Sequence, residues 1–130
     1  MYRAQNFRSF EEFNAFNHGW DADFRALKAG DYCAHLEQFA GQQTLVNIAR
    51  LDSGTVQRGA TPQGMRTFAL PINLSEQATW LNQKIAPLTL MLFPRSGELF
   101  SVSSGSMHMA TVSFKEELFE RIADSKLVRR

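Results

Sequence analysis

The chain has 130 residues, of which 44% are hydrophobic and 21% are charged. This length supports one compact domain with a buried core, and it is too short for two. The 14 basic and 13 acidic residues leave a formal charge of +1, which disfavours direct binding of nucleic acid or anionic lipid by the chain.

A short helix is predicted near the amino terminus. Ser9 and Glu12 have the spacing of a capping box, in which each side chain bonds to the backbone N–H of the other. Phe10, Phe13 and Phe16 recur on one side at helical spacing. We expect a helix over residues 9–17 that packs as a lid on a sheet.

Residues 21–113 predict an antiparallel β-structure, because turn signals recur at intervals too short for crossover helices. The expected strands cover residues 24–28, 32–39, 44–51, 55–58, 66–72, 88–93, 98–103 and 107–113. Residues 88–93 are apolar on both alternations and predict a central strand, whereas residues 75–84 predict a short helical turn or a loop. The pattern favours a sandwich or a jelly-roll barrel.

A second helix is predicted over residues 114–126. Ser113 and Glu116 form another capping box, and acidic residues in the first turn with basic residues 126, 129 and 130 at the end suit the helix dipole. Its apolar stripe, formed by Phe114, Leu118 and Ile122, either docks on the barrel or meets a second copy of the chain.

Two segments resemble the amino-terminal sensor domain of AraC-type bacterial transcription regulators. They read GWDADFRALKAG at residues 19–30 and QRGATPQGMRTF at residues 57–68. The resemblance implies a cupin-like antiparallel double-stranded β-barrel, a jelly roll, that senses a small molecule or mediates dimerisation. We expect a small organic effector, a homodimer and no cofactor. Family members continue into paired helix-turn-helix units, and only one helix follows the barrel here, so we expect DNA binding to lie outside these residues.

The histidines give little sign of a metal site. His18 and His35 are isolated and fit structural roles. His108 shares its alternation with apolar residues, so it is either a ligand contact or a hydrogen-bonded core histidine. Cys33 lies inside a predicted strand without a signal for catalysis. We expect no bound metal, no catalytic residue and no enzymatic activity.

Candidate ligand-binding residues are polar or aromatic groups that interrupt apolar strands. Arg66, Glu98 and Arg50 lie in phase with apolar residues, and each either reaches solvent at the barrel rim or converges on an effector. If two of these three residues converge, the planar guanidinium of an arginine would suit a carboxylate on that effector. Trp80 is either a wall of the binding cavity or simply core.

Three features of the sequence favour a cytoplasmic location. No stretch approaches the roughly 20 apolar residues that span a bilayer, residues 1–10 do not form a signal peptide, and a single cysteine is typical of a reducing compartment. We expect a cytoplasmic sensor and dimerisation domain. There are two alternatives. One is a small cupin enzyme, such as an isomerase or a dioxygenase, and the other is a protein interaction module with a filled core and no ligand.

Overall fold

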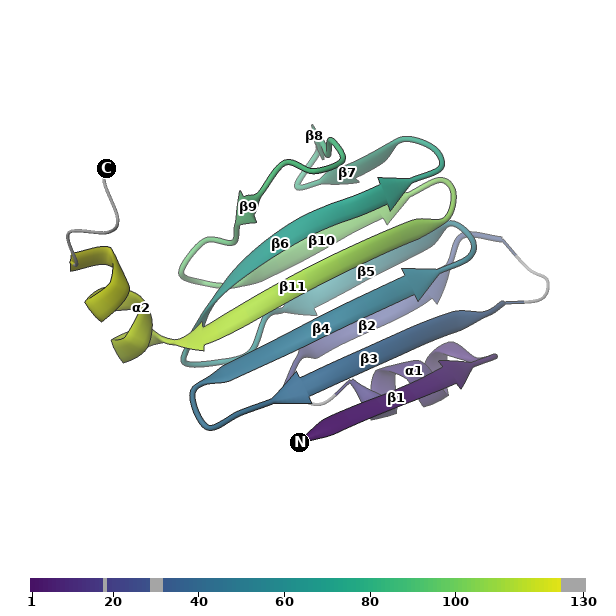
Figure 1. Ribbon diagram of the computed structural model, residues 1–130. Helices are drawn as coiled ribbons and strands as arrows, with labels where there is room; N and C mark the ends of the chain where they lie inside the picture. Colours follow the sequence, from purple (N-terminus) through teal and green to yellow (C-terminus); the bar gives the residue numbers. More distant parts are fainter. Residues whose placement is uncertain (18, 29–31, 125–130) are drawn as a thin grey trace.

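The structure is a computed structural model that describes residues 1–17, 19–28 and 32–124 (Figure 1). The described strands form two sheets in which all paired neighbours run antiparallel. Sheet A contains, in spatial order, β1 (Tyr2–Phe7), β3 (Ala34–Ala40), β4 (Thr44–Leu51), β11 (Met107–Lys115), β6 (Met65–Leu74) and β9 (Met91–Leu92). Sheet B contains β2 (Asp21–Ala26), β5 (Thr55–Ala60), β10 (Glu98–Ser103), β7 (Ala78–Trp80) and β8 (Gln83–Lys84).

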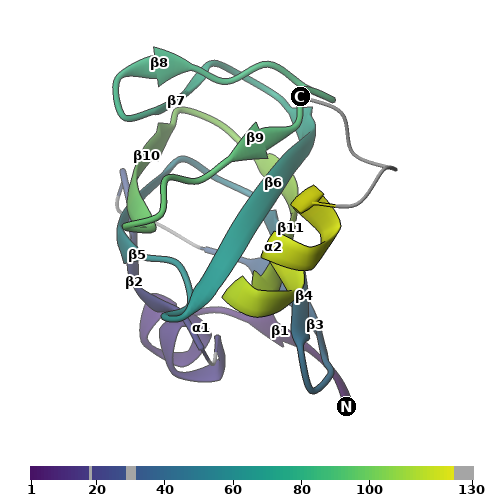
Figure 2. The same ribbon diagram turned by 90° about the vertical axis from the view of Figure 1, so that its left-hand side faces the viewer.

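The two sheets form opposite walls of a barrel (Figure 2). Helix α1 (Phe10–Phe16) packs against β1 and β2, the edge strands of the two sheets, and covers the seam between them. The segment from β7 to β9 lies along the other edges, at β6 and β10. Helix α2 (Glu116–Asp124) follows β11 and lies outside the barrel. The predicted jelly-roll architecture, mainly β with one helix at each end, is confirmed.

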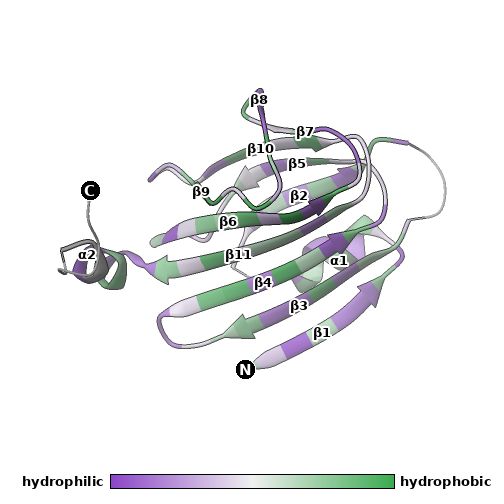
Figure 3. Ribbon diagram, turned by 45° about the horizontal axis from the view of Figure 1, so that its top comes forward, coloured by the Kyte–Doolittle hydropathy of each residue, from purple (hydrophilic) through white to green (hydrophobic). Residues whose placement is uncertain are grey.

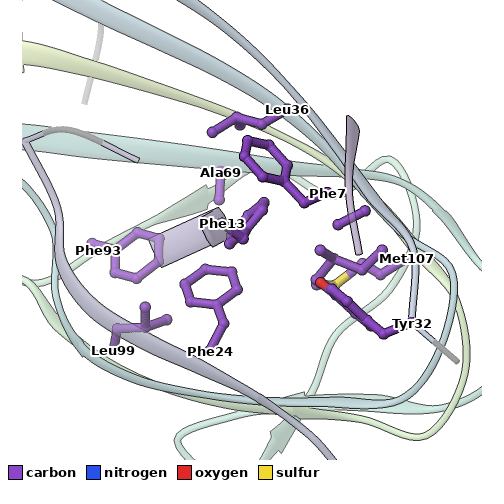
Figure 4. Packing of buried hydrophobic residues seen from close by; sticks show 11 residues of the cluster. Phe7, Phe13, Phe24, Tyr32, Leu36, Ala69, Phe93, Leu99 and Met107 are labelled. Atoms are coloured by element: carbon purple, nitrogen blue, oxygen red, sulfur yellow. The ribbon is translucent and has the colours of Figure 1, made fainter. Parts of the chain in front are cut away.

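The amino-terminal helix forms as its sequence predicts. The Ser9 side chain accepts a hydrogen bond from the Glu12 N–H at 3.2 Å and caps the helix. Phe13 is buried between Phe7 of β1 and Phe24 of β2, with ring centroids 5.5 and 5.0 Å away. These aromatic contacts attach α1 to both sheets and close that side of the core (Figure 4).

The interior of the barrel combines apolar and polar side chains on both sheets. Inward positions of sheet A include several small or polar side chains, at Asn47, Thr67, Ala69 and Ser113. Thr67 and Ser113 lie on neighbouring strands, and their hydroxyl oxygens are 2.8 Å apart in a buried hydrogen bond. Inward polar groups therefore satisfy one another across the sheet.

Strands β4, β11 and β6 carry hydrophobic stretches (Figure 3), and their register and burial place an apolar group at the centre of the outer face of sheet A. The register places Val112 between Val46 and Phe68, and Ala110 between Ile48 and Leu70. We call these six half-buried residues the outer patch: Val46, Ile48, Phe68, Leu70, Ala110 and Val112. The edge strand β1 is mostly hydrophilic by comparison (Figure 3).

Several predicted elements differ from the structure. Residues 2–7 form β1, which the sequence analysis did not predict, because its pairing with β3 is a long-range contact. Residues 75–84 contain β7 and β8 in place of a helical turn or loop. Residues 88–93 do not form a central strand: only Met91–Leu92 pair with β6, at the sheet edge, and Leu88 and Leu90 are 72% and 63% exposed.

The second helix begins two residues later than predicted. Ser113 does not cap it, because Ser113 lies in β11 with its hydroxyl bonded to Thr67, and the helix begins at Glu116. Glu116 and Glu117 occupy the first turn and Arg121 the last, in the order that the helix dipole favours. The predicted end at residue 126 and the basic residues 126, 129 and 130 lie outside the described residues.

Candidate functional site

A cavity of about 60 Å³ lies between the two sheets. At about 10 to 15 Å³ per water-sized volume, it holds the equivalent of about four to six waters. Most of the side chains around it are aromatic or aliphatic, and its polar lining residues are Asn17, Asn47, Gln57, Ser101 and Thr111. The described lining contains no charged side chain. A small apolar molecule suits such a site better than an ion does.

Three amide side chains at one side of the cavity bond to one another. The Asn47 amide lies 3.0 Å from Nε2 of Gln38 and 2.9 Å from Oδ1 of Asn17. All three residues are at least nine-tenths buried. This cluster links β3, β4 and the residue after α1, and it stabilises that wall of the cavity.

Two other lining residues carry buried donors without a partner in the described structure. Nε2 of Gln57 and Nε1 of Trp80 are shielded from solvent and make no hydrogen bond there. Buried polar groups are normally paired, and an unpaired donor costs about 1–3 kcal/mol. The cavity therefore presents hydrogen-bonding capacity that the described chain does not use.

The five candidate ligand-binding residues do not converge on one site. Trp80 lines the cavity, and its ring centroid is 4.8 Å from that of Phe93. Arg66 lies on the outer face of sheet A, with its guanidinium 4.5 Å from the ring centroid of Phe119 in α2. Glu98 is exposed at the start of β10 and is not part of the cavity lining.

Arg50 and His108 do meet, in a second site. A cleft of about 350 Å³ lies at the end of sheet A, and its lining includes both residues together with Cys33, His35 and Asp52. Nε of Arg50 donates to Nε2 of His108 at 3.5 Å. Burial lowers the pKa of His108, and the charge of Arg50 lowers it further. His108 is therefore a neutral hydrogen-bond acceptor at neutral pH.

The other histidines do not complete a metal cluster among the described residues. His35 places Nδ1 2.7 Å from Oδ1 of Asn6, and His18 lies outside the described residues. Within residues 1–17, 19–28 and 32–124, no group of three or more His, Cys, Asp or Glu side chains is arranged to hold a metal ion. Cys33 is an exposed free thiol.

The three residues predicted for the dimer interface lie on two elements. Phe114 belongs to β11, where its ring centroid is 6.3 Å from that of Phe68 in an edge contact. Leu118 is half-buried in α2, and Ile122 follows in the same helix, where its side chain lies outside the described residues. Phe119, the next residue of α2 after Leu118, packs on Phe68 with the ring centroids 5.9 Å apart.

Sequence reasoning missed Gln57 as a site residue. The candidates were polar residues that interrupt an apolar alternation, whereas Gln57 lies two residues after Thr55, on a face of β5 that is polar. Only the pairing of β5 with β10 shows that this alternation faces the barrel interior. No local signal in the sequence distinguishes it from a solvent-facing strand.

Comparison with known proteins shows the fold. Neither a protein-family model nor a curated protein matches the sequence. The solved structure of the AraC-like transcriptional activator CuxR is similar, with a TM-score of 0.67 and 10% identity over 93% of this chain. The match covers 50% of the CuxR chain, so this chain spans about half the length of that protein.

Two further similar structures are those of a synthase and an isomerase. Ectoine synthase from P. lautus has a TM-score of 0.48 and 11% identity, over 88% of this chain and 84% of its own. A sugar phosphate isomerase of the cupin superfamily from Silicibacter pomeroyi has a TM-score of 0.45 and 11% identity, over 62% and 59%.

These structures correct one expectation from the sequence. We expected no enzymatic activity, and that exclusion is wrong, because the similar structures include a synthase and an isomerase. What the comparisons do support is the fold predicted from the resemblance. The described chain has a cupin-like jelly-roll fold of the kind found in an AraC-like regulator.

Proposed function

We propose that this chain is a cytoplasmic, cupin-like sensor domain, in which a small organic effector occupies the internal cavity and changes the position of α2. The observation that carries the proposal is that one wall of the uncharged cavity also contacts the strand on which α2 packs. Met91 and Phe93 line the cavity, and Leu92 between them pairs with Phe68 of β6. The Phe68 ring packs on Phe119 of α2 at 5.9 Å.

A second contact joins the same wall to the helix. Arg95, two residues after Phe93, forms an ion pair with Glu116 at 2.6 Å. The Arg95 side chain is 71% exposed, so this pair contributes little to stability by itself. It nevertheless attaches the segment after β9 to the first turn of α2. A displacement of β9 by an occupant would therefore reach the helix at two points.

The outer patch supplies a place for a partner. It is apolar, faces away from the core and adjoins α2 through Phe68. Because α2 already covers one end of this surface, a second copy of the chain that docks there would contact both α2 and the patch. We propose a homodimer through this surface, to which Phe114 of β11 and Leu118 and Ile122 of α2 contribute. The signal would then pass to the partner or to a DNA-binding region outside these residues.

The proposal is tested by filling the cavity with an apolar probe and measuring whether the environment of α2 changes. Benzene is titrated into the ¹⁵N-labelled chain while the amide signals of residues 116–121 are followed by NMR. We expect saturable shifts of those signals in the wild-type chain. Ala49→Leu, which fills the cavity wall at β4, should abolish them, and Ala15→Leu on the exposed face of α1 should not. Binding without any change in α2 would overturn the coupling.

None of the helices in the described residues is long and apolar enough to cross a bilayer.

A further inference from the structure

Three inward residues of sheet B form one row across neighbouring strands. Ser101 of β10 is the register partner of Gln57 on one side and of Trp80 on the other. All three line the cavity. Neighbouring strands are about 4.8 Å apart, so the backbones of Gln57 and Trp80 are separated by about 10 Å. Their side chains therefore flank the Ser101 hydroxyl on the same wall.

The outer members of this row carry the two unpaired donors. Gln57 is 7% exposed, and its Nε2 has no partner among the described residues. Nε1 of Trp80 is likewise buried without a partner. The Trp80 ring packs on Phe93, which is 4% exposed, so the indole is held in place beside the cavity. Two buried donors on one wall suit one acceptor oxygen, because a carbonyl oxygen has two lone pairs.

We propose that Gln57 and Trp80 are the specificity-determining residues of the cavity, and that they select an uncharged, largely apolar molecule with one carbonyl-type oxygen, such as a ketone, ester or amide. This inference rests on the proposed function and names its ligand class. An uncharged ligand follows from the lining, since a buried carboxylate would have no cation beside it. The apolar body follows from the rings of Phe13, Phe24 and Phe93 around the same cavity. An arginine-bound carboxylate, the alternative from the sequence, does not fit these walls.

Three probes of the same ring size test the ligand class. Cyclohexanone carries the acceptor, methylenecyclohexane replaces its oxygen by a CH₂ group, and cyclohexanecarboxylate carries a charge. Each is titrated into the ¹⁵N-labelled chain while the indole signal of Trp80 and the side-chain amide signal of Gln57 are followed. We expect cyclohexanone to shift both signals and to bind about tenfold more tightly than methylenecyclohexane. Cyclohexanecarboxylate should not bind.

Variants separate the hydrogen bonds from cavity size. Gln57→Leu keeps a similar volume and removes one donor, so it should lose about tenfold in affinity for cyclohexanone and none for methylenecyclohexane. Gln42→Leu, at an exposed position in the turn after β3, is the matched control and should leave both affinities unchanged. Without any probe, Gln57→Leu should also raise the melting temperature, because it removes a buried unpaired group.

The outcomes distinguish this inference from the proposed function. If methylenecyclohexane binds as tightly as cyclohexanone and Gln57→Leu changes neither affinity, the ligand class is wrong, while a response of α2 to benzene still supports a sensor. If Gln57→Leu lowers the melting temperature, an ordered water pairs the donors and the inference is overturned. If no probe enters the cavity, both proposals fail.

Discussion

Arg50 and His108 are directly opposed on neighbouring strands of sheet A, and their side chains share the cleft at its end. Burial and the charge of Arg50 lower the pKa of His108, and Glu37 acts weakly in the opposite direction. Because the pKa is lower in the folded chain than its ordinary 6.5, the unfolded chain binds more protons below that pH. The free energy of unfolding should therefore fall as the pH drops below about 6.5 and His108 becomes protonated.

The first prediction concerns this pair. Arg50→Gln removes the positive charge and should raise the pKa of His108 part of the way toward its ordinary value, since burial remains. An NMR titration of the His108 ring protons measures the pKa directly. Arg58→Gln, at an exposed position on β5 of sheet B, is the control and should leave it unchanged. A pKa that falls in Arg50→Gln would contradict the assigned role.

At the same scale, the sequence predicted which residues share a face but not which way the face points. Arg66 does alternate with Phe68, Leu70 and Ile72, as expected. That alternation faces outward, because the inward positions of β6 are Thr67, Ala69 and Pro71, all buried. In this strand the more apolar face is the outer one, so hydrophobicity alone indicates the wrong side of β6 for the cavity.

Among the elements, β11 shows how a local signal is overridden by tertiary pairing. Ser113, Phe114 and Lys115 read as the start of a helix, but they continue the strand through pairs with both β4 and β6. The Ser113 hydroxyl bonds to Thr67 in place of a helix N–H. The chain can turn into α2 only after the pairing ends, and the Glu116 N–H then bonds to the Gly64 carbonyl at 3.1 Å.

This arrangement leads to the second prediction. Ser113→Ala leaves the buried Thr67 hydroxyl unpaired and should lower the free energy of unfolding by about 1–3 kcal/mol. The double variant Thr67→Val with Ser113→Ala removes both polar groups and should recover part of that loss. Urea denaturation followed by circular dichroism measures both variants. If Ser113→Ala instead melted α2 alone, Ser113 would be a helix cap after all.

Elements with local signals were predicted well, and elements that depend on distant partners were not. Helix α1 carries its cap and its three aromatic residues within eight positions. Strand β1 has no such signal, and it exists through its pairing with β3, whose register partners lie between Phe7↔Ala34 and Tyr2↔Phe39. The apolar residues 88–93 lie in two different environments. Met91 and Phe93 line the cavity, whereas Leu88 and Leu90 are exposed.

In the whole molecule, the two faces of sheet A have different proposed roles, one in ligand binding and the other in contact with a partner. Its inner face contributes part of the cavity, through Asn47, Ala69 and Thr111. Its outer face carries the outer patch and the contact with α2 through Phe68. A single layer of backbone therefore separates the cavity from the outer patch. A small shift of β6 or β9 would act on both sides, which is the arrangement that a population-shift mechanism requires.

The last prediction tests the partner surface. We expect the wild-type chain to sediment as a dimer at micromolar concentration, because the apolar outer patch is continuous with α2. Val112→Asp places a charge at the centre of the patch, on a side chain that faces away from the core, so it should give a folded monomer. Val56→Asp, a half-buried valine on a strand of sheet B, is the matched control and should remain dimeric. Circular dichroism checks that both variants keep the wild-type fold. A wild-type chain that stays monomeric at high micromolar concentration would remove the dimer, because a stable interface of this kind holds well below that range.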